Sequence, residues 1–121
     1  MANVFNYQLK FMKACGQTVD KNNAKQFELY TNLIAEEVEE LQVAIANQDR
    51  VEQLDALIDI IVVTVGAIHS MGAEGEGAWK EVMNTNFAKI DKDSGMVRKR
   101  EDGKILKPVG WVPPNLGPYV K

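Results

Sequence analysis

Cysteine, histidine and long apolar runs are scarce in this sequence, and each scarcity excludes a class of protein. With one cysteine, Cys15, no internal disulfide can form. One cysteine and one histidine cannot supply the donors of a typical zinc site. The longest apolar run, residues 60–68, is interrupted twice and is too short to span a bilayer. No basic segment followed by an apolar stretch opens the chain, so we expect no signal peptide.

An excess of positive charge is also missing. The net charge of −3 gives no general attraction to a nucleic-acid polymer or to a membrane surface. We therefore expect neither kind of partner. The single cysteine is compatible with a reducing cytoplasm, and we expect the protein there. The length of 121 residues suits a single hydrophobic core.

Apolar residues recur at helical spacing over most of the chain. The spacing predicts four helices, with Asn22 or Asn23 capping the second, Asp49 capping the third and Gly72 ending the third. Their expected ranges are 3–14, 23–47, 49–71 and 74–90. The β-branched run 60–65 would also suit a strand, but the length of the whole segment favours a helix.

The third predicted helix is apolar on nearly every side in its second half. Such a surface has to be buried on nearly every side, and a chain this short offers little to cover it. We therefore predict an all-α, four-helix, bundle-forming domain whose core is completed by oligomerisation.

The last thirty residues have a different character. Asp102-Gly103 lies between two short segments and predicts a hairpin, and four prolines from residue 108 onward prevent regular structure. Trp111 is expected to anchor this segment. We predict a helical domain over residues 1–91, which would hold any functional site, and a C-terminal hairpin and proline-rich tail over residues 92–121. The tail would pack on the domain or on a partner subunit.

Four glutamates cluster on the second predicted helix, at positions 36, 37, 39 and 40. A solvated charged face is the ordinary explanation of such a run. On a helical wheel, however, Glu37 and Glu40 lie toward the flank of the apolar stripe, whereas Glu36 and Glu39 point away from it. Two carboxylates one turn apart repel each other unless a cation or a proton lies between them.

Acids also share one face of the third helix, where Glu52, Asp55 and Asp59 are spaced three and four residues apart. Favourable interaction with the helix dipole explains an acid in the first turn, but not Asp59 beside the apolar run. A short connection makes the two helices antiparallel, which brings Glu40 level with residues 55–59. Oxygen donors that converge from two helices predict a site for Mg²⁺ or Mn²⁺.

At these positions the chain resembles the MazG-like and phosphoribosyl-ATP pyrophosphohydrolase-like families, whose signature is EExxE followed by ExxD on the next helix. Residues 36–40 resemble the first part, with Glu37 and Glu40 as the inward pair, and Glu52 to Asp55 spells the second. A rival register would place the family aspartate at Asp59, but Ala56 would then occupy the glutamate position. Asp59 stays a candidate ligand or a partner of one.

The resemblance extends through Asn84-Thr85-Asn86-Phe87-Ala88-Lys89 and through the tail around Asp102-Gly103-Lys104. It implies a hydrolase that converts a nucleoside triphosphate to a monophosphate and pyrophosphate, in nucleotide-pool control or house-cleaning. It also implies Mg²⁺, a homodimer or homotetramer, and a water proton taken up by Glu37 or Glu40. The residues expected to bind the substrate are Asn86, Lys89, Lys104 and Lys107.

Two alternatives are retained. One is hydrolysis of phosphoribosyl-ATP itself, and the long C-terminal tail argues against it. The other is a non-catalytic helical interaction module, in which the acids would face a basic partner. A carboxylate as deep as Asp59 is not needed on such a surface.

Overall fold

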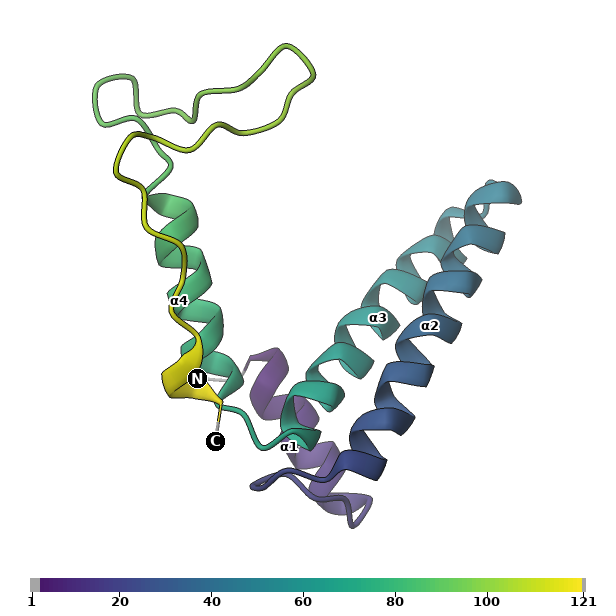
Figure 1. Ribbon diagram of the computed structural model, residues 1–121. Helices are drawn as coiled ribbons and strands as arrows, with labels where there is room; N and C mark the ends of the chain where they lie inside the picture. The colour runs from purple at the N-terminus through teal and green to yellow at the C-terminus, as the bar shows by residue number, and fades with distance from the viewer. Residues whose placement is uncertain (1–2, 121) are drawn as a thin grey trace. The chain divides into compact units, whose positions relative to one another are not determined.

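Helices make up all of the regular structure in the computed structural model, which describes residues 3–120. In chain order the elements are α1 (Val4–Ala14), α2 (Ala24–Ala46), α3 (Arg50–Ser70), α4 (Gly75–Phe87) and the single 3₁₀ turn η1 (Gly117–Tyr119) (Figure 1). Isolated β-bridges occur in the described part of the chain, but no strand does. The predicted all-α class and its four helices are confirmed.

The starts of the first three helices are set by asparagine or aspartate side chains. The Oδ1 atoms of Asn3, Asn23 and Asp49 each accept the backbone N–H three residues later, at 2.9, 3.1 and 3.1 Å. Each cap satisfies an amide that has no partner inside the helix. At the end of α3, Gly72 adopts a φ of +72°, a left-handed conformation that glycine adopts readily.

α2 and α3 lie side by side along their length as an antiparallel hairpin, and α1 packs against α3 (Figure 1). The buried core is formed by Met12, Tyr30 and Ala67, with partly buried side chains around it. This core occupies the end of the hairpin where α2 begins and α3 finishes. The predicted acids lie nearer the connection between the two helices.

A polar network fixes the core end of the hairpin. Gln26 of α2 donates from Nε2 to the Thr18 carbonyl at 2.7 Å and to the Ser70 hydroxyl at 2.9 Å. Its Oε1 accepts the Thr18 N–H at 2.9 Å, and the Asn23 N–H donates to the Ser70 carbonyl at 2.7 Å. The start of α2 is thereby hydrogen-bonded to the last residue of α3.

The burial expected for α3 is incomplete within one chain. Val65, Gly66 and Ala67 are buried, as their apolar surroundings require. Ile61 is still 44% exposed and Leu54 is 62% exposed. α1 and α2 together cover only part of the helix surface, so a broad apolar face of α3 is left uncovered within residues 3–75.

The chain divides into two compact units, residues 3–75 with residue 120, and residues 76–119. In the second unit, α4 packs with the tail. The hairpin consists of one bridge, Lys99 to Ile105, and its turn is closed by two hydrogen bonds: the Arg100 N–H donates to the Lys104 carbonyl, and the Gly103 N–H donates to the Arg100 carbonyl. The boundary that we predict at residue 91 is a different one, because it separates the predicted helices from the tail. It stays a prediction. None of the described helices is long and apolar enough to cross a membrane.

Candidate functional site

A groove of about 580 Å³ runs between α2 and α3 near their connection. Its charged lining is entirely acidic and consists of Glu36, Glu39, Glu40, Asp49, Glu52 and Asp55. The two ion pairs recorded for the described residues, Arg98–Asp91 and Arg100–Asp102, both lie in the tail. No ion pair of the described chain therefore neutralises this groove, and its field favours a cation.

Glu37 lies beside this groove and carries an unusual oxygen. Its Oε2 atom is buried and has no hydrogen-bond partner among the described residues. Burial raises the pKa of Glu37 to about 7, and it is raised further by a hydrogen bond with the Glu40 carboxyl and by the charges of Glu40, Asp59 and Asp55. A buried oxygen left without a donor is costly unless a proton or a metal ion takes that place.

The predicted acids form two overlapping groups. Glu40 and Asp55 line the groove and also act on Glu37, so they belong to both groups. Asp59 joins Glu37: burial raises its pKa, and the charges of Asp55 and Glu40 raise it further. Glu52 lines the groove but is not among the groups that shift the pKa of Glu37. The structure thus brings Asp59, rather than Glu52, to the partly buried acids.

These side chains suit a magnesium ion in their chemistry. Carboxylate oxygens are the donors that Mg²⁺ prefers, and the unsatisfied oxygen of Glu37 has the character of an unused ligand. Within residues 3–120, no three acidic, histidine or cysteine side chains already converge in a metal-binding arrangement. Glu37, Glu40, Asp55 and Asp59 would hold the ion, and they would have to turn toward it.

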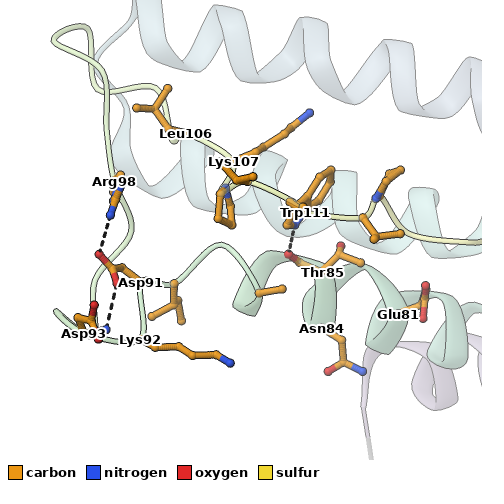
Figure 2. Close-up of a pocket in the computed structure, with 17 residues that line it drawn as sticks. Glu81, Asn84, Thr85, Asp91, Lys92, Asp93, Arg98, Leu106, Lys107 and Trp111 are labelled. Atoms are coloured by element: carbon orange, nitrogen blue, oxygen red, sulfur yellow. Dashed lines mark hydrogen bonds and ion pairs between the residues drawn. The ribbon is translucent and has the colours of Figure 1, made fainter.

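The candidate substrate residues all belong to the unit formed by residues 76–119. Lys89 donates from Nζ to Asn86 Oδ1 at 3.1 Å, so the structure brings these two together. Lys107 lines a second groove of about 990 Å³, together with Trp111 and Thr85 (Figure 2). Lys104 lies at the hairpin turn, where its backbone N–H donates to Asp102, and it does not line that groove.

Trp111 anchors the tail as predicted. Its indole Nε1–H donates to the Thr85 carbonyl of α4 at 2.7 Å (Figure 2). A second contact follows along the tail, where the Asn115 N–H donates to Glu81 Oε2 at 2.8 Å. The proline-rich segment is therefore attached along α4.

Glu36 and Glu39 line the groove between α2 and α3, although neither was predicted from the sequence as a site residue. The helical wheel correctly turned them away from the apolar stripe, but the groove opens on that outer side. Asn47 and Asp49 line it too. The signal was the complete run of four glutamates next to a short polar connection, rather than the inward pair alone.

The family model for phosphoribosyl-ATP pyrophosphohydrolase matches residues 10–86. The chain belongs to this family. Membership in this family of MazG-like pyrophosphohydrolases, enzymes that act on acid anhydrides, agrees with the all-α fold. The match includes every candidate acid on α2 and α3 and ends at Asn86, before Lys89 and the tail. None of the curated proteins matched the chain.

Proposed function

We propose that this pyrophosphohydrolase cleaves a ribo- or deoxyribonucleoside triphosphate to the monophosphate and pyrophosphate, with Mg²⁺ or Mn²⁺ as cofactor. Its role would be nucleotide-pool control or house-cleaning. The observation that carries the proposal is the buried Oε2 of Glu37, which no donor among the described residues contacts, together with the charges of Glu40, Asp55 and Asp59 that raise the pKa of this carboxyl. Such a cluster without a cationic side chain is costly unless it binds a cation.

The acids have two tasks in this proposal. When bound, Mg²⁺ supplies charge neutralisation for the phosphates and makes a water molecule more acidic. Glu37, Glu40, Asp55 and Asp59 hold and orient the ion. Glu37 or Glu40 takes the proton from the attacking water. Asn86, Lys89, Lys104 and Lys107 are proposed to bind the substrate.

Phosphoribosyl-ATP is the second candidate substrate, because the matching family model carries the name of that hydrolase. Both reactions release pyrophosphate and use the same acids. The distinguishing feature would be recognition of the phosphoribosyl group on the base.

Pyrophosphate release from a panel of NTPs, dNTPs and phosphoribosyl-ATP tests the proposal, with Mg²⁺ and with EDTA. Turnover of one or more triphosphates that stops in EDTA supports it, whereas turnover of phosphoribosyl-ATP alone selects the second candidate. Glu37→Gln and Asp55→Asn should each abolish most of the activity. Glu28→Gln, an exposed acid on the same helix, is the matched control. If no substrate turns over, a non-catalytic helical interaction module becomes the better explanation.

A homodimer or homotetramer is part of the proposal. The support is the uncovered apolar face of the first unit, in which Ile58, Ile61 and Val62 of α3 line a shallow apolar pocket with Val4 and Tyr7 of α1. Exposed apolar patches of this kind mark interaction surfaces.

A further inference from the structure

Two lysine ammonium groups lie over one tryptophan ring in the second unit. The Nζ of Lys89, just beyond α4, is 5.1 Å from the centroid of the Trp111 ring, and the Nζ of Lys107, in the tail, is 4.9 Å from it. Both distances are within the range of a cation–π interaction. The two nitrogens are therefore within about 10 Å of each other although eighteen positions separate them in the sequence.

The ring that holds the two lysines is itself fixed. The hydrogen bond from Trp111 Nε1 to the Thr85 carbonyl sets the position of the indole against α4. Lys89 is restrained a second time by its hydrogen bond to Asn86. Two flexible side chains are thus held in place before any ligand arrives, which lowers the entropy cost of binding.

Neither ammonium is neutralised by a carboxylate within the described residues. The nearby acids of the groove have partners: Glu81 accepts the Asn115 N–H, and Asp91 accepts from Arg98 and from the Asp93 N–H. Asp93 also lines the groove, but Figure 2 shows it at the Asp91 turn, well away from Trp111. Neither lysine is held in an ion pair among the described residues, so both ammonium groups are available to a bound anion.

The geometry points to Trp111 as a positioning residue that presents Lys89 and Lys107 as a two-cation site for a chain of phosphate groups. Phosphate oxygens can accept hydrogen bonds from both ammonium groups, and such charge-assisted bonds are the strong ones. Only the identity of the natural ligand of this site rests on the proposed function. That ligand would be the phosphate chain of the substrate or the released pyrophosphate. Its components all belong to residues 76–119.

Titration calorimetry of the full chain with inorganic tripolyphosphate, in EDTA, tests this site without any hydrolysis. Lys89→Met and Lys107→Met should each weaken binding about tenfold, because each removes a charged hydrogen-bond donor. Trp111→Leu should weaken it about as much, while Trp111→Phe, which keeps an aromatic face, should retain part of the affinity. Lys99→Met removes an exposed charge from the hairpin and should leave binding unchanged.

Unchanged binding in both lysine variants would overturn the inference. Equal weakening in Lys99→Met would also overturn it, since that result indicates general attraction to a basic tail. If Trp111→Leu fails to fold by circular dichroism, the two lysine variants and Trp111→Phe still decide the matter. Tripolyphosphate binding that needs both lysines, in a protein that hydrolyses no nucleotide, would uphold the site and reject the proposed function. Nucleotide hydrolysis with an unchanged KM in both lysine variants would uphold the proposed function and reject the two-lysine site.

Discussion

The ring of Tyr30 on α2 lies directly against the backbone of Gly66 on α3. A Cβ atom at Gly66 would be 2.7 Å from the Tyr30 Cζ and closer still to two other ring atoms. The absence of a side chain at position 66 therefore lets the two helices approach each other at the core. The Tyr30 hydroxyl donates a hydrogen bond to Gln17 Oε1 at 2.6 Å.

Gly66→Ala is expected to destabilise the protein by about 1–3 kcal/mol, because the new methyl group overpacks a buried contact. This loss should exceed the small gain from replacing glycine with alanine in a helix. Urea denaturation followed by circular dichroism measures it. In the double variant with Tyr30→Ala, the alanine at 66 should cost much less, and an equal cost there would show that the ring is not responsible.

The raised pKa of Glu37 predicts how stability changes with pH in the absence of metal. Because the pKa moves from 4.5 to about 7 on folding, the folded chain keeps a proton that the unfolded chain has released between those values. The free energy of unfolding should therefore fall as the pH rises from about 4.5 to about 7. The raised pKa of Asp59 acts in the same direction.

Melting temperatures in EDTA from pH 5 to pH 8 measure this dependence. Glu37→Gln should flatten the slope and melt higher than the unmodified protein at pH 8. Glu28→Gln is the control and should leave the slope as it was. An unaltered slope in Glu37→Gln would show that this carboxyl does not titrate as described.

Magnesium should stabilise the folded protein, since only the folded chain brings the acids of α2 and α3 together. A concentration one hundred times the Kd gives about 2.7 kcal/mol. For a protein of this size that is a rise in Tm of about 5 °C or more. Glu37→Gln and Asp55→Asn should each remove most of the rise. A matching rise with NaCl at equal ionic strength would mean charge screening instead of binding.

The apolar face of α3 should govern the oligomeric state. Ile58 is 50% exposed in a single chain, so Ile58→Glu costs little within the subunit but places a charge in the expected interface. Sedimentation velocity should show a shift to monomers. Val120→Glu changes an equally exposed valine near the C-terminus and should leave the assembly intact. If the unmodified protein already sediments as a monomer, the proposed oligomer is wrong.

The helices were predictable because their signals are local. The caps at Asn23 and Asp49 and the stop at Gly72 involve neighbours only a few residues away, and all three occur as expected. The last helix ends at Phe87, earlier than the predicted 90, because the chain turns there. The hairpin at Asp102-Gly103 was equally local.

The site was predictable only in part, because its geometry depends on how two helices pack. Spacing placed Asp55 and Asp59 on one face, but it could not show that Asp59 would approach Glu37 while Glu52 would line the outer groove. Nor could it show two lysines over Trp111, since residues 89, 107 and 111 meet only through the path of the tail.

The hydrogen bonds of Gln26 have a consequence for the acids, which lie farther along the same two helices. The Gln26–Ser70 contact ties the hairpin at one end, and the short connection through Gln48 and Asp49 ties it at the other. Two helices tied at both ends resist sliding along each other, which restrains the axial offset between Glu40 and Asp55. Adjustment of the proposed site to ions of different radius, such as Mg²⁺ and Mn²⁺, would therefore depend on side-chain rotation.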